Sequence, residues 1–250
     1  MILGVIPARY ASTRFPAKML ADIAGKAMIQ RVYEQAQKAT KLAKVVVATD
    51  HAAIAEKVIS FGGEVVMTSV HHQSGTDRCA EAWKKQPVSF SHLINIQGDE
   101  PFIHPEQIDL LATILQENDV EIATLAMEIK DKSRLFDPNV VKVIRDAASN
   151  ALYFSRHPIP FLRNLSQEKW LENFPYLQHI GLYGYRTDVL EKITQLSSSM
   201  LEKAESLEQL RWLENGFKIR VGITTYESFG IDVPEDIEKV LTNIRQKNML

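Results

Sequence analysis

Two acidic side chains in the middle of the chain have the surroundings of a metal or ligand site. Residues 95–101 read NIQGDEP, so Asp99 and Glu100 come soon after residues 90–94, a short run that is typical of a buried strand. The final proline is expected to stop that strand, and the glycine allows a tight turn. In open α/β sheets, ligands bind at the carboxyl ends of the strands. An acidic turn exposed to water is the alternative.

A cation-rich loop follows an earlier apolar run. Residues 2–6 are expected to form a buried strand that ends at Pro7. The following loop carries three cations and two hydroxyls: Arg9, Arg14 and Lys18, with Ser12 and Thr13. Backbone N–H groups and converging positive charges in such a loop can hold a polyphosphate. The Walker A and dinucleotide-binding glycine patterns are both absent, and a solvated basic loop is the alternative.

Two further polar stretches could contribute to the same site. Residues 71–78 read HHQSGTDR, and Gln73, Ser74 and Arg78 offer donors and acceptors to the edge of a nucleobase. Capping of the next helix by Ser74 or Thr76 is the alternative, and it is compatible with that role. Zinc is disfavoured, because no cysteine or suitably spaced histidine is near. Asp232 precedes a proline at the start of the last predicted helix, where it could be either a cap or a ligand.

Composition narrows the class of protein. The chain has 250 residues, 45% hydrophobic and 24% charged, with a net charge of −2, so no general attraction to nucleic acid or to an anionic membrane is expected. The single cysteine, Cys79, excludes an internal disulfide framework and is expected to be a small buried side chain. No apolar stretch approaches the ~18 residues that span a bilayer, and no signal peptide is visible. We therefore expect a cytoplasmic protein.

The predicted elements alternate between strand and helix, which favours a parallel sheet with helices on both faces. The expected strands cover residues 2–6, 44–48, 64–67, 90–94, 121–127 and 218–225. The expected helices cover residues 26–39, 51–60, 77–85, 202–215 and 234–247, with another beginning at His104. From residue 140 to residue 186 the segments look antiparallel, and a long irregular excursion covers residues 155–176. We expect a single domain over residues 1–250.

Several stretches, in order, resemble the signatures of bacterial CMP-Kdo synthetases (3-deoxy-manno-octulosonate cytidylyltransferases). They are IPARYASTRFPAK (6–18), ATDH (48–51), HQSGTDR (72–78), QGDEP (97–101), ALYFSR (151–156), HIGLYGYR (179–186) and LEQLR (207–211). The resemblance runs from residue 2 to the last predicted helix. It implies an α/β fold with a Rossmann-like mixed, mostly parallel sheet of the sugar nucleotidyltransferase type. It also implies an antiparallel extension, about residues 140–186, that contributes to a sugar site and a homodimer interface.

The reaction that this family implies is CTP + Kdo → CMP-Kdo + pyrophosphate, for lipopolysaccharide assembly, with CTP and Kdo as the partners. By resemblance, Arg9, Arg14 and Lys18 would hold the triphosphate, and Gln73, Ser74 and Arg78 would lie near the cytosine and ribose. Similarly, Gln97, Arg156, His179, Tyr183, Glu208 and Gln209 would surround the sugar acid, and Asp99 and Asp232 would hold Mg²⁺. Lys18, Arg14 and Asp99 would be the catalytic groups.

The chemistry of phosphoryl transfer agrees with these roles. Positioning and charge neutralisation carry most of the catalysis in such reactions. Mg²⁺ prefers hard oxygen ligands, typically one or two carboxylates together with phosphate oxygens and water. Two aspartates at strand or helix ends would supply that pair, and Arg156 offers a fork for the carboxylate of an acid sugar.

The sequence also departs from the family pattern and leaves alternatives open. Ala17 stands where glycine is usual, Ala27 where proline is usual, and Val233 where threonine is usual. Residues 161–164 read FLRN in place of WxRD, which touches the sugar side, so 8-amino-Kdo and sialic acid remain alternative acceptors. A dinucleotide-dependent oxidoreductase would need the missing glycine fingerprint. An inactive nucleotide-binding module is disfavoured by the presence of Asp99, Lys18 and Asp232 together.

Overall fold

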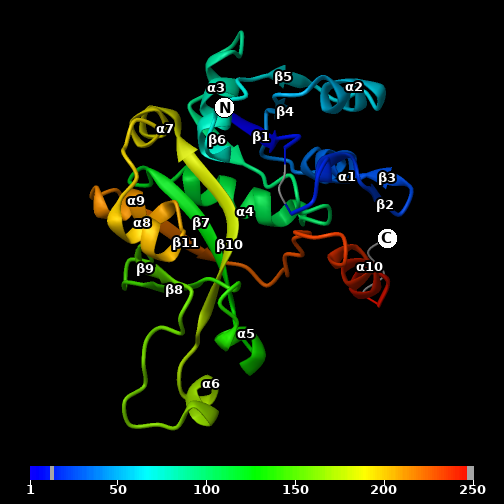
Figure 1. Ribbon diagram of the computed structural model, residues 1–250. Coiled ribbons are helices and arrows are strands. Elements are labelled where there is room, and N and C mark those ends of the chain that lie inside the picture. Colours follow the sequence, from blue (N-terminus) through cyan, green and yellow to red (C-terminus); the bar gives the residue numbers. More distant parts are fainter. Residues whose placement is uncertain (12–13, 247–250) are drawn as a thin grey trace. The chain divides into compact units, whose positions relative to one another are not determined.

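The computed structural model describes residues 1–11 and 14–246, shown in Figure 1. The chain groups into two compact units. The first unit contains Met1–Ala112 and the segment that starts at Ser228, and the second unit contains Thr113–Glu227. The second unit is therefore an insertion in the sequence of the first. The single domain expected over residues 1–250 stays a prediction.

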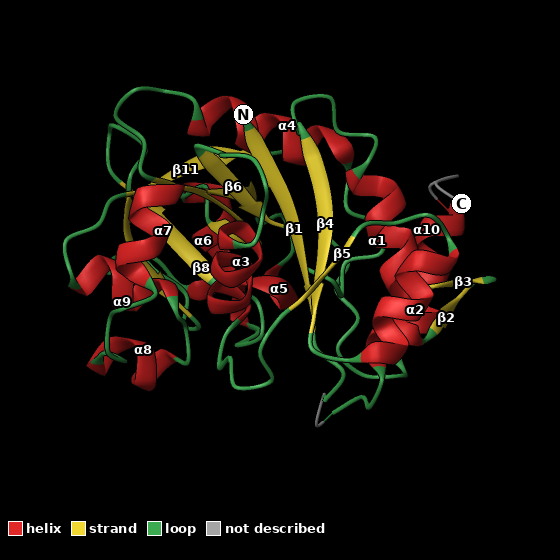
Figure 2. Ribbon diagram, turned by 90° about the horizontal axis from the view of Figure 1, so that it is seen from above, coloured by secondary structure: helices red, strands yellow, loops and turns green. Residues whose placement is uncertain are grey.

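The first unit is built on four parallel strands in the order β6-β1-β4-β5. These are β1 (Ile2–Ala8), β4 (Lys44–Thr49), β5 (Val65–Met67) and β6 (His92–Asn95). Figure 2 shows β1, β4 and β5 lying side by side. The middle residues of β1 and β4 are buried, because a parallel sheet is covered on both faces, and this is why both runs are apolar. The predicted parallel sheet is confirmed.

Proline does not end the first strand, which corrects the expectation that it would. β1 continues through Pro7 to Ala8, which pair with Ala48 and Thr49 of β4. On its other side β1 pairs with β6 only as far as Val5, so no strand there needs the missing N–H of the proline. Similarly, β6 ends at Asn95, well before the proline that was expected to stop it.

Helices and short elements complete the first unit. They are the 3₁₀ helix η1 (Lys18–Leu20), the ribbon β2 (Asp22–Ile23) and β3 (Lys26–Ala27), and the helices α1 (Met28–Ala36), α2 (Ala52–Ser60), α3 (Gly75–Lys84) and α10 (Asp236–Gln246). The helix α4 (Pro105–Leu115) crosses the boundary between the units in the sequence. No described helix is long and apolar enough to cross a membrane.

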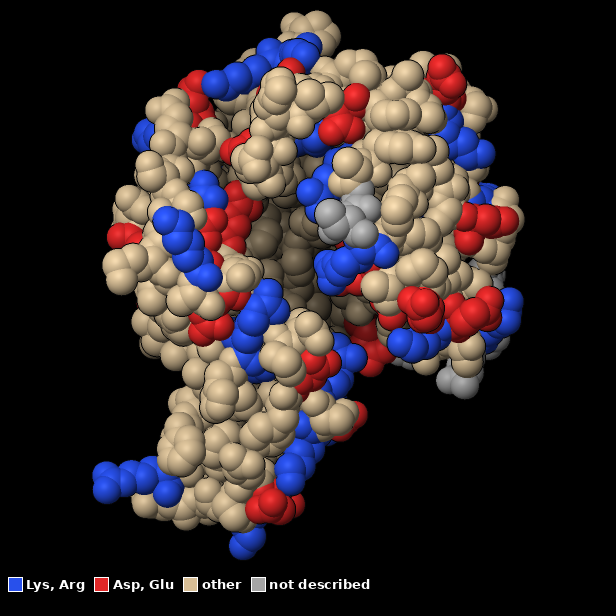
Figure 3. Space-filling model, in the orientation of Figure 1, with Lys and Arg blue, Asp and Glu red and all other residues tan. Residues whose placement is uncertain are grey.

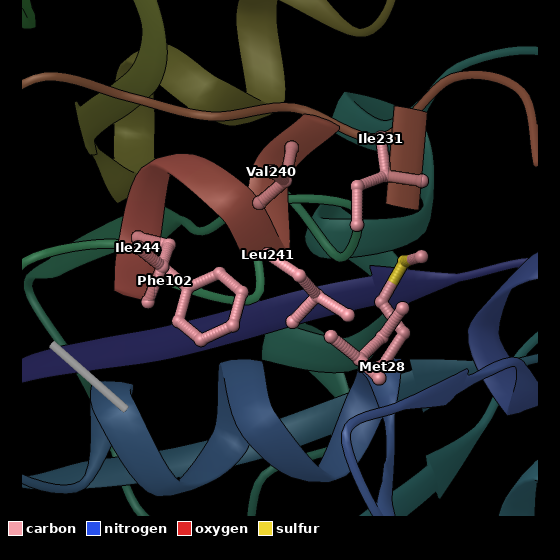
Figure 4. Close-up of a cluster of buried hydrophobic side chains, with 7 residues drawn as sticks. Met28, Phe102, Ile231, Val240, Leu241 and Ile244 are labelled. Atoms are coloured by element: carbon pink, nitrogen blue, oxygen red, sulfur yellow. The ribbon is translucent and has the colours of Figure 1, made fainter. Parts of the chain in front are cut away.

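An apolar cluster fixes α10 and the segment before it. Its buried side chains are Ile23, Met28, Phe102, Ile231, Val240, Leu241 and Ile244, most of which are labelled in Figure 4. The helix begins at Asp236 and not at residue 234, and the Asp236 carboxylate accepts hydrogen bonds from the N–H groups of Asp232 and Val233. Asp232 is therefore not the cap of this helix.

The second unit contains the antiparallel strands. β11 (Ile219–Ile223) pairs parallel with β7 (Ile122–Glu128), which pairs antiparallel with β10 (Leu177–Arg186). β8 (Lys142–Arg145) pairs antiparallel with both β10 and β9 (Ala151–Ser155). The antiparallel character expected for residues 140–186 is thus present. The chain has a mixed α/β fold with a mostly parallel sheet.

Several helices of the second unit differ from expectation. The helix expected over residues 202–215 is two helices, α8 (Met200–Glu205) and α9 (Gln209–Glu214). The break falls at Ser206, whose backbone is left-handed with φ 53°, and a right-handed helix cannot pass through that conformation. Three further helices were not expected: α5 (Lys132–Phe136), α6 (Trp170–Asn173) and α7 (Thr187–Ile193). Of these, α6 lies within residues 155–176 and follows the 3₁₀ helix η2 (Gln167–Lys169), so part of the expected irregular excursion is helical.

Candidate functional site

A pocket of about 280 Å³ in the first unit collects the residues that were predicted to bind the nucleotide and the metal. Its lining residues are Pro7, Arg9, Arg14, Lys18, Met19, His72, Gln73, Ser74, Gly75, Arg78, Gln97, Gly98, Asp99 and Asp232. Ser12 and Thr13 lie outside the described residues. On the face drawn in Figure 3, basic and acidic side chains are interspersed.

The centre of this pocket is a cluster of two cations and two carboxylates. The Lys18 ammonium lies 2.7 Å from Asp99 Oδ2 and 3.6 Å from Asp232 Oδ1. An Arg14 guanidinium nitrogen lies 3.1 Å from the same Asp232 oxygen. Because Lys18 is only 7% exposed, its charge is largely removed from water and needs these partners. The cluster brings together two carboxylates that are far apart in the sequence.

Backbone geometry places the Asp99 carboxylate beside the first loop. A Cβ atom at Gly98 would lie 2.9 Å from the Pro7 carbonyl oxygen and 3.0 Å from the Met19 sulfur, so only glycine permits this approach. The Ile231 N–H donates to the Asp99 carbonyl at 3.0 Å, and this bond brings the Asp232 segment alongside. Two hydrogen-bonded segments therefore present the two carboxylates to one pocket.

The donor set suits a hard divalent cation that keeps ligands from outside the protein. Asp99 and Asp232 both face the Lys18 ammonium, so their oxygens already share one cation. Among the described residues, no group of three or more His, Cys, Asp or Glu side chains is placed to hold a metal. Two carboxylates with phosphate oxygens and water match the usual coordination of Mg²⁺.

The loop over residues 71–78 has a structural role and also lines the pocket. Ser74 caps α3, with its Oγ accepting from the Asp77 N–H at 3.1 Å. Arg78 is 3% exposed and donates to Asp50 Oδ2 at 2.8 Å and to Thr68 Oγ1 at 2.6 Å. Much of its guanidinium is therefore held by the protein itself, and Asp50 is a partner that sequence reasoning missed.

Except for Gln97, the residues predicted to bind the sugar lie in the second unit. The structure brings three of them together: His179, Tyr183 and Glu208. The rings of His179 and Tyr183 lie 5.2 Å apart, and Trp212 packs edge-on against Tyr183. Burial, together with the charge of Glu208, raises the pKa of Tyr183 well above its usual range. Gln209 begins α9 and is buried, whereas Gln97 lines the pocket of the first unit.

Hydrogen bonding assigns the proton of the His179 ring. Burial lowers its pKa to about 3, so the ring is neutral at physiological pH. Its Nε2 lies 3.0 Å from Thr124 Oγ1, and that hydroxyl is also 3.1 Å from the Ile180 carbonyl and 2.8 Å from the Leu182 carbonyl. A hydroxyl has one proton, so when Thr124 donates it to one of these carbonyls, the hydroxyl oxygen can accept from a proton on Nε2. The Nδ1 atom is then left as an acceptor.

Arg156 mainly contacts backbone carbonyls of its own unit. Its Nε, Nη1 and Nη2 donate to the carbonyls of Glu205, Pro138 and Ser206, at 2.7, 2.9 and 3.3 Å. The Glu205 carboxylate in turn accepts from the Ser155 hydroxyl and the Arg156 N–H. This network fixes the turn between α8 and α9. No sequence signal distinguishes Glu205 from the other carboxylates of a charged helix.

Comparisons with known proteins identify the family. A cytidylyltransferase family model matches residues 3–219. The chain is 55% identical to the 3-deoxy-manno-octulosonate cytidylyltransferase of Parabacteroides distasonis and 54% identical to that of Cytophaga hutchinsonii, with 96% of both chains covered in each case. It also superposes on a CMP:2-keto-3-deoxy-manno-octonic acid synthetase solved in complex with CTP, with a TM-score of 0.90 and 42% identity over 98% of this chain and 99% of that one. The chain belongs to the 3-deoxy-manno-octulosonate cytidylyltransferase family.

Proposed function

We propose that this protein transfers CMP from CTP to Kdo and releases pyrophosphate, a step that supplies activated sugar for lipopolysaccharide assembly. The observation that carries the proposal is the pocket in which Arg14, Lys18, Asp99 and Asp232 converge. A triphosphate brings several negative charges, and these cations can neutralise them. The carboxylates can hold the metal that accompanies such a nucleotide.

The residues of the pocket position and neutralise the reacting groups. The anomeric hydroxyl oxygen of the sugar bonds to the α-phosphorus, the bond to the pyrophosphate oxygen breaks, and the hydroxyl proton is lost. Arg9, Arg14 and Lys18 would stabilise the charge on the phosphates, and Lys18, being buried, acts where solvent screens least. Asp99 and Asp232 would hold Mg²⁺, which when bound shields the α-phosphate and acidifies the hydroxyl.

We assign base and sugar recognition to the remaining residues. Gln73, Ser74 and Arg78 would lie near the cytosine and ribose. The acid sugar would be bound by Gln97, Arg156, His179, Tyr183, Glu208 and Gln209. The His179 Nδ1 acceptor suits a sugar hydroxyl. Arg156 has N–H groups beyond the three that hold carbonyls, and these are available to a sugar carboxylate.

Pyrophosphate release tests the proposal directly. The purified protein with Mg²⁺ and Kdo should release pyrophosphate with CTP and at far lower rates with ATP, GTP or UTP. Replacing Kdo by 8-amino-Kdo or sialic acid tests the acceptor and should lower kcat/KM. Absence of CTP-dependent release with all three sugars would contradict the proposed reaction.

We also infer a homodimer formed through residues 140–186. Two large apolar side chains in this range support the inference: Leu152 is 59% exposed and Phe161 is 69% exposed. Sedimentation analysis should give twice the chain mass, and Leu152→Glu should shift the distribution toward the monomer. A wild-type protein that sediments as a monomer at assay concentrations would refute this assignment.

A further inference from the structure

The carboxylate of Asp232 depends on a segment that has no regular secondary structure. The segment leaves β11 after Ile223, enters the first unit at Ser228, and becomes helical only at Asp236. Neither a strand ladder nor a helix fixes residues 228–235. The position of Asp232 relative to Asp99 must therefore come from specific contacts of this segment.

Contacts at Ile231 fix the end of the segment nearest to Asp232. The Ile231 N–H donates to the Asp99 carbonyl at 3.0 Å, and its carbonyl accepts from the Lys18 ammonium at 3.0 Å. The Ile231 side chain is fully buried, and Figure 4 places it in the apolar cluster with Met28 and Leu241. These contacts leave the earlier part of the segment to be held by something else.

The earlier part is held by a buried carboxyl group. Glu100 follows Asp99 directly and is 9% exposed, and its Oε2 accepts a hydrogen bond from the Ser228 hydroxyl. A carboxyl group is costly to bury unless it is hydrogen-bonded, so a buried glutamate needs a compensating contact. Glu100 is the sequence neighbour of Asp99, and Ser228 is the first residue of the segment that returns to the first unit.

We propose that Glu100 and Ser228 are positioning residues that clamp the Asp232 segment onto the Asp99 turn and so set the separation of the two carboxylates. The clamp and the Ile231 contacts anchor the segment at two points, on either side of Phe229 and Gly230. Neither clamp residue lines the pocket, so the effect would reach the reaction through Asp232. This inference rests on the proposed function for its consequence in catalysis, although the clamp itself is a property of the fold.

Amide exchange and manganese binding test the clamp with two independent readouts. Ser228→Ala removes the donor and Glu100→Met removes the acceptor, whereas Glu100→Gln keeps an acceptor oxygen. The matched control is Ser60→Ala, which removes a single exposed hydrogen bond at the end of α2. Hydrogen–deuterium exchange over residues 229–235 should be about tenfold faster in the first two variants, and Glu100→Gln and the control should match the wild type.

Mn²⁺ binding to the CTP-loaded protein, measured by electron paramagnetic resonance, should weaken about tenfold in Ser228→Ala and Glu100→Met. The KM for Mg²⁺ should rise more than kcat falls. Wild-type exchange over residues 229–235 in both variants would overturn the clamp. Faster exchange with unchanged Mn²⁺ affinity would overturn its role in positioning Asp232. A wild-type protein without CTP-dependent activity would refute the proposed function alone, because the exchange experiment needs no substrate.

Discussion

The pocket of the first unit and the aromatic cluster of the second unit handle polar groups in opposite ways. In the pocket, Lys18 and Arg14 contact Asp99 and Asp232 directly, so charges of both signs meet at short range. In the aromatic cluster, His179 is kept neutral by burial and ring contacts dominate. Charged groups that neutralise one another can exchange partners when a polyanion and a metal arrive. Neutral groups held in a packed cluster instead recognise shape and hydroxyls.

This difference explains why the reaction type is easier to infer than the acceptor. Phosphate and metal chemistry needs particular charges, and those charges are visible in the sequence. Recognition of one acid sugar would depend on where neutral donors and acceptors point, and we propose the Nδ1 atom of His179 as one of them. Mutations that alter charge in the pocket should therefore have the largest effects, and mutations that alter backbone support should have smaller ones.

The largest expected effect comes from removing one carboxylate of the pocket. Asp99→Asn leaves an oxygen that can still accept from Lys18 but removes the charge needed by a divalent cation, so we expect kcat to fall about a thousandfold. The melting temperature should stay close to that of the wild type. Steady-state pyrophosphate release measures the loss, with Asp119→Asn as the control because Asp119 makes only an exposed ion pair. Activity within tenfold of the wild type would remove Asp99 from the metal site.

Glu100 differs from Asp99 and Asp232, which both lie near the Lys18 ammonium. The buried Glu100 carboxylate instead accepts a hydrogen bond from the neutral Ser228 hydroxyl. Burial raises its pKa from 4.5 to about 7, against the hydrogen bond from Ser228 and with the charge of Asp99 adding to the rise. Between these two pH values the unfolded chain releases a proton that the folded chain keeps, so the free energy of unfolding falls as the pH rises. The loss reaches about 3 kcal/mol above pH 7.

Glu100→Gln should abolish that loss and make the protein more stable than the wild type above pH 7, by up to about 3 kcal/mol. Below pH 4.5 the two proteins should be equally stable. Urea denaturation at a series of pH values measures the difference. A pH dependence that is the same in both proteins would show that Glu100 ionises normally in the fold.

Substitution of Arg156 measures how much this side chain contributes to the stability of the second unit. Arg156→Lys keeps the charge but cannot reach three carbonyls with a planar fork, so we expect a loss of about 2 kcal/mol in unfolding free energy. The KM for the sugar should also rise, because the turn between α8 and α9 loosens and the planar fork proposed to pair with the sugar carboxylate is lost. Denaturant melts and sugar titrations separate the two effects, with the exposed Arg163→Lys as a control. A raised KM at unchanged stability would show that Arg156 acts on the sugar directly and contributes little to the stability of the turn.

The smallest effect concerns the backbone of the loop that carries Lys18. Ala17 has a left-handed backbone with φ 54°, which costs a residue with a Cβ atom about 1 kcal/mol, partly offset by the flexibility of glycine in the unfolded chain. Ala17→Gly should therefore raise the unfolding free energy by about 0.5 kcal/mol and leave kcat unchanged. Thermal melts of both proteins measure the gain. A lower melting temperature would show that the entropy of glycine outweighs the strain.

Much of the site could be predicted from the sequence, because its residues lie in short stretches whose order and chemistry are distinctive. Ala17 is one example. Glycine is usual at this position in the family, and Ala17 has the left-handed backbone that glycine adopts easily. Contacts between distant stretches could not be predicted. The ion pair of Asp50 with Arg78 and the clamp of Ser228 on Glu100 depend on tertiary placement. The break at Ser206 could not be predicted for the same reason, because the turn is held by Arg156, which follows β9 and donates to the carbonyls of Glu205 and Ser206.

The first unit is discontinuous in the sequence, and this has a consequence for how the protein is made. The ribosome synthesises Asp99 before the whole second unit and Asp232 after it. Before Ser228 and the residues that follow emerge, Met28 and Phe102 lack the side chains that later pack against them. These are Ile231, Val240, Leu241 and Ile244. A nascent chain therefore cannot assemble both carboxylates with Lys18, and the pocket is completed only after the second unit has left the ribosome.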